Sequence, residues 1–149
     1  MKRLIVVRHG EYGDNGGLNT NGQAQIDALA DRLHRLIDRA SVLILSSTAV
    51  RARESAKILA KAFGGGIIED YEVLWSESRH PEDLPAALAL VKSRQDLADV
   101  IILVTHLEYT ELLPAYFCRM VLDIHCPSHS LRNGRAWVIN CELKTLELV

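Results

Sequence analysis

Two arginines and two histidines in this chain are of the types that handle phosphate groups: Arg8, His9, Arg51 and His106. Each of them stands at the end of a short apolar stretch or a few residues beyond one. Arginine offers a fixed fork of N–H donors that matches phosphate oxygens. Histidine can act as a nucleophile at phosphorus and can carry a proton near neutral pH. If the fold brings these four side chains together, they indicate phosphoryl-transfer chemistry.

The elements that would position them begin with three apolar runs rich in β-branched residues: Arg3–Val7, Val42–Leu45 and Asp99–Val104. Continuous runs of this kind are typical of buried parallel strands. Ile67 and Ile68 begin a further short strand. Because ligands of open α/β sheets bind beyond the carboxyl ends of the strands, we expect the arginines and histidines to meet at that edge.

Helical periodicity separates these runs. Apolar residues recur at helical spacing in a first amphipathic helix, whose predicted buried positions are Ile26, Leu29, Ala30, Leu33, Leu36 and Ile37. A second helix spans Ala52–Phe63 and ends at Gly64–Gly66, because glycine readily adopts the left-handed cap conformation. A third begins near Pro81 and continues to Val91, and a weaker fourth lies within Tyr109–Val121, with Pro114 near its start or at a kink.

The last stretch has a different pattern. Asn133-Gly134 is a turn signal, and Ala136–Ile139 and Leu143–Leu148 are predicted strands joined by a short connection. Alternating helices and strands followed by such a pair predict an α/β fold. We expect a three-layer α/β/α sandwich with a mostly parallel sheet and an antiparallel edge.

Composition narrows the class of protein. A chain of 149 residues, 48% apolar and 24% charged, fits one globular domain over residues 1–149. A net charge of −2 provides no general field for nucleic acid or an anionic membrane, so neither is expected as a partner. No apolar run is long enough to span a bilayer, no signal-peptide pattern is found, and three irregularly spaced cysteines suit reduced thiols. We therefore predict a cytoplasmic protein.

Several motifs resemble the histidine phosphatase superfamily, also called phosphoglycerate mutase-like. Its Arg-His-Gly signature corresponds to Arg8-His9-Gly10, which Glu11 follows. Leu18, Gly22 and Gln25 are similar to its Leu-Thr-x-x-Gly-x-x-Gln segment, with Asn19 in place of threonine. Ser47–Ala56 resembles its Ser-x-x-x-Arg-Ala-x-x-Thr-Ala segment, with Ser55 in place of threonine. His106 matches the second histidine, although Leu107 differs from the glycine, glutamate or asparagine common at the next position. The resemblance covers nearly the whole chain and implies a phosphoglycerate mutase-like fold.

The resemblance also implies the role of each site residue. His9 would attack phosphorus and become a phosphohistidine that water later hydrolyses, while Arg8, Arg51 and His106 hold the phosphoryl oxygens. The neighbouring arginines should keep His9 unprotonated, and Asn15 could add a hydrogen bond to the phosphoryl group. This scheme requires no metal and no other cofactor.

The acid that protonates the leaving group is less well defined by the sequence. Many relatives use a carboxyl group after the third strand, where Glu77 is the nearest candidate, although a solvated loop carboxylate is the simpler interpretation of this residue. The short chain resembles the small SixA-like phosphohistidine phosphatase branch, which favours phosphohistidine on a protein as the substrate. Hydrolysis of small phosphate esters and a non-catalytic phosphate-binding module remain the alternatives.

Overall fold

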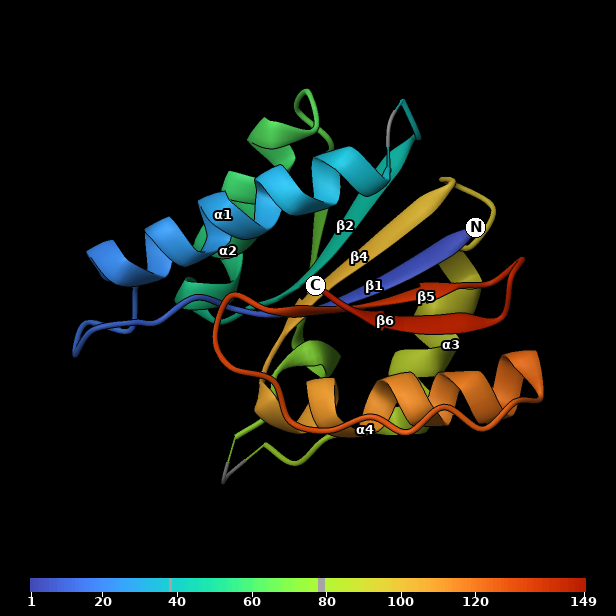
Figure 1. Cartoon of the computed structure of the whole chain (residues 1–149). Helices are drawn as coiled ribbons and strands as arrows, with labels where there is room; N and C mark the ends of the chain where they lie inside the picture. The colour runs from blue at the N-terminus through green and yellow to red at the C-terminus, as the bar shows by residue number, and fades with distance from the viewer. Residues whose placement is uncertain (38, 78–79) are drawn as a thin grey trace.

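The computed structural model describes residues 1–37, 39–77 and 80–149 and arranges them around one sheet (Figure 1). The strands are β1 (Arg3–Arg8), β2 (Val42–Ser47), β3 (Ile67–Tyr71), β4 (Val100–Thr105), β5 (Ala136–Asn140) and β6 (Thr145–Leu148). The helices are α1 (Thr20–Leu36), α2 (Val50–Ala62), α3 (Leu84–Arg94) and α4 (Leu107–Phe117), with a 3₁₀ turn η1 (Glu72–Leu74) and a π turn η2 (Cys118–Leu122). None of the described helices has the length and apolar character needed to cross a membrane.

The described strands lie in the order β3-β2-β4-β1-β5-β6. β1, β2, β3 and β4 run parallel, whereas β5 pairs antiparallel with β1 and β6 pairs antiparallel with β5. This is the predicted mixed sheet with its antiparallel edge. β1 therefore lies between β4 and β5, and its carboxyl end lies next to that of β4.

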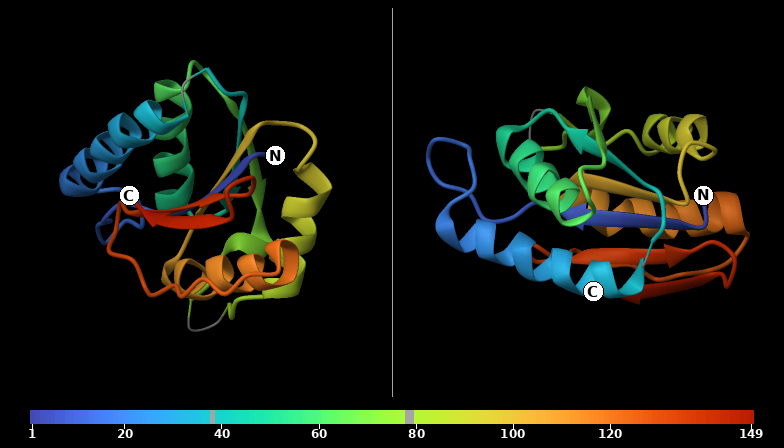
Figure 2. Two further views of the ribbon diagram at one scale, coloured as in Figure 1. Left: turned by 45° about the vertical axis from the view of Figure 1, so that its right-hand side comes forward. Right: turned by 90° about the horizontal axis from the view of Figure 1, so that it is seen from above.

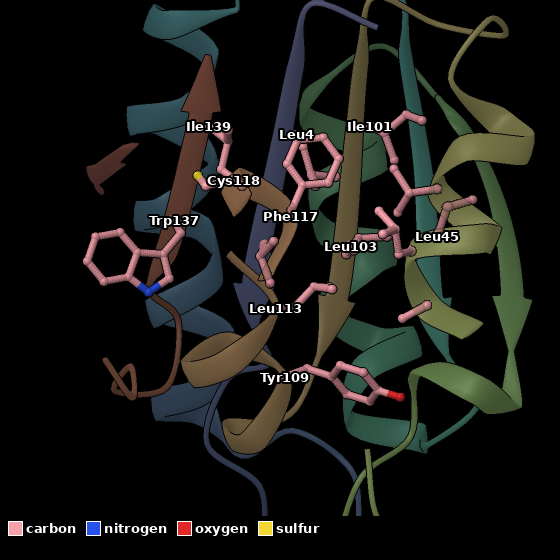
Figure 3. Close-up of a cluster of buried hydrophobic side chains, with 14 of the residues drawn as sticks. Leu4, Leu45, Ile101, Leu103, Tyr109, Leu113, Phe117, Cys118, Trp137 and Ile139 are labelled. Carbon is pink, nitrogen blue, oxygen red and sulfur yellow. The ribbon is translucent and has the colours of Figure 1, made fainter. Parts of the chain in front are cut away.

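Helices cover both faces of the sheet, as Figure 2 shows from two sides. Alternation along the strands divides the core into two layers. Ile5 and Val7 pack with the buried faces of α1 and α2, and Leu4 and Val6 pack with α3 and α4. Figure 3 shows the second layer, in which Leu113 and Phe117 of α4 pack against the strands and Trp137 of β5 lies beside them. The three-layer α/β/α prediction is confirmed.

The ends of the strands and the start of α4 determine where the site residues lie. β1, β2 and β4 each extend past their apolar runs to Arg8, Ser47 and Thr105. α4 begins at Leu107, directly after His106 and earlier than predicted. Since Leu107 is helical and not among the described residues with positive φ, this position does not require glycine.

Other boundary predictions were wrong for local reasons. α3 begins at Leu84 rather than near Pro81, because the Asp83 side chain caps it by accepting from the Ala86 N–H. β6 begins at Thr145 rather than Leu143, which is exposed in the preceding turn. Leu36 lies in the last turn of α1 and is 40% exposed, so it does not belong to the buried face.

The start of α1 fixes the loop that follows His9. Asn19 caps the helix by accepting from the Gly22 N–H over 2.7 Å, so the asparagine does what a threonine would do there. The backbone of Gly10 and Glu11 then packs directly on Gly22. A Cβ on Gly22 would lie 2.7 Å from the Glu11 nitrogen and closer still to its carbonyl oxygen. Only a glycine allows the loop to approach the helix this closely.

We expect Gly22→Ala to lower the free energy of unfolding by about 1–3 kcal/mol, because the clash with Glu11 outweighs the better helix propensity of alanine. Urea unfolding measures this change. Gly13→Ala is the matched control, since the nearest atom to a Cβ there is the Asn15 Oδ1 at 3.7 Å. Equal stability of the Gly22 variant and the wild type would contradict the close-packing argument.

Candidate functional site

The carboxyl edge of the parallel strands brings the four predicted side chains together. Arg8 ends β1 and His9 follows it, Arg51 lies in the first turn of α2, and His106 lies between β4 and α4. The rings of His9 and His106 lie 5.0 Å apart between centroids. Both histidines are buried, at 3% and 2% exposure. The sequence-based prediction that these residues converge therefore agrees with the geometry.

The hydrogen bonds of His9 define its tautomer. Its Nδ1 lies 2.8 Å from the Gly10 carbonyl oxygen, which can only accept, so Nδ1 carries the proton. Its Nε2 lies 3.2 Å from the Arg51 Nε, which can only donate. The lone pair of His9 therefore resides on Nε2, among the side chains of the site.

His106 has the opposite tautomer. The Arg51 Nη2 donates to its Nδ1 over 3.3 Å, so its proton is on Nε2. That Nε2–H donates to the Ser47 Oγ over 2.8 Å, and the same Oγ accepts from the Ala49 N–H over 3.3 Å. Ser47 therefore orients the His106 ring with its Nδ1 toward Arg51.

Both imidazoles are held in the neutral form. The pKa of His9 is lowered to about 4, mainly by burial and also by the charges of Arg51 and Arg8, while the hydrogen bond to the Gly10 carbonyl opposes the shift. Burial, followed by the charges of His9, Arg51 and Arg8, lowers the pKa of His106 to about 2. An unfolded histidine titrates near 6.5, so this contribution to stability is present above pH 6.5 and is lost as the pH falls toward these values.

Arg51 links the two histidines to the rim of the site. Besides donating to both rings, its Nη2 lies 3.6 Å from the Glu77 Oε2, and its guanidinium lies 4.5 Å from the centre of the Tyr12 ring. The Arg51 side chain is 12% exposed, whereas Glu77 is 44% exposed. Glu77 therefore lies at the mouth of the site, in contact with one of its cations.

Arg8 approaches the site from β1. Its Nη1 donates to the Leu131 carbonyl over 2.6 Å, and its Nε is buried without a hydrogen-bond partner in the described part of the chain. Burial lowers the pKa of Arg8, and the charge of Glu108 opposes that shift. The guanidinium thus keeps donor capacity that its own surroundings do not use.

Hydrogen bonds to neighbouring helices hold the loop around His9. The Gly10 N–H donates to the Ser55 Oγ over 3.1 Å, and the Ser55 hydroxyl donates to the Arg51 carbonyl over 2.8 Å. Ser55 therefore ties the His9 loop to the helix that carries Arg51. The Glu11 carboxylate accepts from the side chains of Asn21 and Gln25, chiefly Asn21, which lowers its pKa. Glu11 shapes the loop and makes no contact with the histidines that the structure records.

One predicted residue is not brought to the other four. Asn15 lies in the exposed part of the loop before α1, and its Oδ1 accepts from the Gly17 N–H over 3.1 Å. Within residues 1–37, 39–77 and 80–149, no hydrogen bond joins Asn15 to Arg8, His9, Arg51 or His106. Its predicted contact with a phosphoryl group stays a prediction.

The structure also adds residues that the sequence reasoning missed. The Asn133 Nδ2 donates to the His9 carbonyl over 3.0 Å, although the Asn-Gly pair was interpreted only as a turn. Glu108 lies in the first turn of α4, accepts from the Ser76 Oγ over 2.7 Å, and acts electrostatically on both His9 and Arg8. Its position two residues after His106 was the available signal.

Among the residues that the structure describes, no group of three or more His, Cys, Asp or Glu side chains is placed to hold a metal ion. The site is instead built from guanidinium and imidazole groups, which suit an oxyanion.

The fold is an α/β fold of the phosphoglycerate mutase-like type, and guanidinium and imidazole groups gather at the carboxyl edge of its parallel strands. Residues 4–74 match the sequence model of the histidine phosphatase superfamily (branch 1). The N-terminal part of the chain is thus similar to that superfamily in sequence, and the described fold is that of phosphoglycerate mutase-like proteins over nearly its whole length. A comparison with curated proteins finds no significant match.

Solved structures share the fold at low sequence identity. The protein histidine phosphatase SixA complexed with tungstate superposes with a TM-score of 0.78 at 15% identity, covering 99% of this chain and 94% of that one. The putative phosphohistidine phosphatase SixA from Agrobacterium tumefaciens gives 0.68 at 20% identity, covering 93% and 91%. A mycobacterial glucosyl-3-phosphoglycerate phosphatase in complex with VO3 gives 0.69 at 19% identity, covering 100% and 98%.

We expect nitrogen-resolved NMR at pH 5.5 to find both imidazoles neutral, with the proton on Nδ1 in His9 and on Nε2 in His106. Both rings should be neutral at this pH because burial and the arginine charges lower the pKa values of His9 and His106. Arg51→Met should raise the pKa of His9 by removing one of those charges, although burial still holds it below 6.5. A wild-type His9 that is protonated at pH 5.5 would contradict the geometry described above.

Proposed function

We propose that this protein is a phosphatase that forms a covalent phosphohistidine on His9, and that its substrate is phosphohistidine carried by a protein. The observation that carries the proposal is the orientation of the His9 ring. Its Nδ1–H is bound to the Gly10 carbonyl, which leaves the Nε2 lone pair directed toward Arg51. A neutral imidazole held in this way is a competent nucleophile at neutral pH.

The proposed reaction has two displacements. In the first, the His9 Nε2 forms a bond to phosphorus while the bond from phosphorus to the leaving group breaks, and the leaving group takes a proton. In the second, a water oxygen attacks the phosphohistidine and the bond from Nε2 to phosphorus breaks. Inorganic phosphate leaves and His9 returns to its starting form. The enzyme thereby replaces one difficult displacement by two easier ones.

The surrounding cations would stabilise the charge on the transferred group. Arg8 and Arg51 supply guanidinium donors that are already positioned, so little reorganisation is needed in the transition state. The His106 Nδ1 accepts from Arg51 in the free site. A phosphoryl oxygen placed against that atom would favour protonation of His106, after which Nδ1–H donates to the oxygen. His106 would therefore change from acceptor to donor as substrate binds.

Three observations support a protein-borne phosphohistidine as the substrate. Tyr12 and Val50 near the site are about half exposed, which is consistent with an open mouth. An imidazole leaving group also requires much less acid assistance than an alkoxide does. Of the structures compared above, one is described as the protein histidine phosphatase SixA complexed with tungstate and another as a putative phosphohistidine phosphatase SixA.

Small phosphate esters are the second candidate class, and Glu77 is the observation that favours them. Its carboxylate lies beside Arg51 at the mouth, where a departing alkoxide would need a proton. Glu108 is the other nearby carboxylate, but it is half-buried and its Oε2 already accepts from Ser76. We therefore propose Glu77 as the acid for ester substrates.

Replacing the nucleophile tests the main proposal. We expect wild type to release phosphate from a phosphohistidine-bearing protein without added metal, and His9→Ala to lose at least about a thousandfold in rate. Labelled phosphate should stay on wild-type protein after a rapid quench under alkaline conditions. Phosphate binding without release or a phosphoenzyme would instead support the non-catalytic module.

Matched carboxylate variants test the acid. Glu77→Gln should reduce hydrolysis of an alkyl phosphate by about 10²- to 10⁴-fold and leave phosphohistidine hydrolysis nearly unchanged, since only the alkoxide needs a full proton transfer. Glu108→Gln is the comparison, and its effect on ester hydrolysis should be smaller. A larger loss in the Glu108 variant would assign the acid to that residue, and equal losses on both substrates would contradict the leaving-group argument.

A further inference from the structure

A cavity of about 800 Å³ adjoins the site on the side of Arg8. The residues that matter for its chemistry are Arg8, Glu11, Leu131, Arg132, Asn133 and Arg135. Its volume lies in the range of small-molecule binding pockets. None of the proposed chemical steps uses it, apart from the shared residue Arg8.

The cavity wall carries unbalanced positive charge. Arg132 and Arg135 are exposed, and the described ion pairs include neither of them nor Arg8. The pKa of Arg32 is lowered mainly by burial and also by the charge of Arg135, so Arg135 lies close to a further cation. Gathering like charges in this way is unfavourable unless an anion relieves it.

The one carboxylate of the wall does not cancel this charge. Glu11 is bound by the side-chain amides of Asn21 and Gln25, and none of the hydrogen bonds or ion pairs in the described residues joins it to an arginine. Its role is to hold the loop after His9. The guanidinium groups of the wall therefore remain available to an anionic ligand.

The cavity and the site share Arg8 and are connected by hydrogen bonds. Arg8 donates to the Leu131 carbonyl, and Asn133 donates to the His9 carbonyl, so the same segment forms the wall and supports the nucleophile. A group seated in the cavity would contact the guanidinium that, in the proposed reaction, holds a phosphoryl oxygen. A substrate bound at His9 is thus within reach of the cavity.

We propose that this cavity binds a second anionic group, a carboxylate or a phosphate, of the phosphorylated substrate. This inference rests on the proposed function and specifies its substrate class: phosphohistidine within an acidic segment of a protein is preferred over phosphohistidine in a neutral one. Arg132 and Arg135 are the selectivity residues, and Arg8 is shared by the two anions. The preference is electrostatic and weakens as salt rises.

Binding to a catalytically inactive background tests the site independently of turnover. Fluorescein-labelled phosphohistidine peptides flanked by glutamate or by glutamine are titrated against His9→Ala protein by anisotropy at low salt. We expect the glutamate peptide to bind about five- to tenfold more tightly, as two partly exposed ion pairs allow. With Arg132→Ala and Arg135→Ala added to the His9→Ala protein, the affinities for the glutamate and glutamine peptides should differ by no more than about twofold. Arg119→Ala, an exposed arginine on η2 at a different cavity, should leave it unchanged.

The proposal would be overturned if the two peptides bound equally and if pyrophosphate and orthophosphate displaced them equally well. The cavity would then be a solvent-filled surface pocket lined by arginines that binds no ligand group. Preferential competition by pyrophosphate, abolished by the two arginine substitutions, would support the site and assign it to a phosphate rather than a carboxylate. A preference that persists in the Arg132/Arg135 variant would also overturn it.

Turnover measurements separate this inference from the proposed function. In the His9-containing enzyme, Arg132→Ala with Arg135→Ala should leave hydrolysis of p-nitrophenyl phosphate unchanged and raise KM only for the glutamate peptide. If wild type hydrolyses none of these substrates, the proposed function fails. The binding preference of the His9→Ala protein then still tests whether the cavity binds an anionic group. If hydrolysis proceeds without a peptide preference, the phosphatase stands and the cavity proposal fails.

Discussion

The site depends on one guanidinium that donates to two imidazoles at once. Arg51 can bond both the His9 Nε2 and the His106 Nδ1 only while both rings are neutral and have opposite tautomers. The Gly10 carbonyl sets the first tautomer and the Ser47 hydroxyl the second. Burial keeps both rings neutral, because charging either one would place a cation beside Arg51 and Arg8 in a poorly solvated pocket. An unprotonated Nε2 on His9 at neutral pH follows directly from this arrangement.

The rest of the fold serves to keep those groups at fixed separations. Parallel pairing of β4 with both β1 and β2 places Arg8, Ser47 and His106 at one edge. The loop after His9 could still move relative to α2, but the Ser55 hydroxyl bridges Gly10 and the Arg51 carbonyl, and Gly22 lets the same loop lie against α1. The loop therefore has helices on two sides, and the position of His9 is set by backbone packing rather than by the flexible ends of long side chains.

Short-range patterns were enough to predict much of this. Apolar runs predicted the parallel strands, and the residues that follow them predicted which side chains would meet. The left-handed glycines after α2 were also predicted. What could not be predicted depends on contacts between distant segments. Asn133 bonds the His9 carbonyl across 124 residues, and Ser76 bonds Glu108 across 32. Neither pairing leaves a periodicity or a spacing in the sequence, and Asn133 was interpreted only through its turn propensity with Gly134.

The departures from the superfamily pattern concern local structure more than chemistry. Asn19 caps α1 in place of threonine, Ser55 supplies the hydroxyl that a threonine would supply, and Leu107 simply begins a helix. Arg8, His9 and Arg51 fall within the matched residues 4–74, whereas the cavity arginines Arg132 and Arg135 fall beyond them. Loops on a rigid scaffold are where selectivity changes at least cost to the fold. Because Arg8 bonds the Leu131 carbonyl at the head of that loop, a change in the segment is transmitted to a cation of the site without altering the histidines. Under the proposed function, a reaction centre built on the sheet is thus combined with a substrate preference set by the segment beyond it.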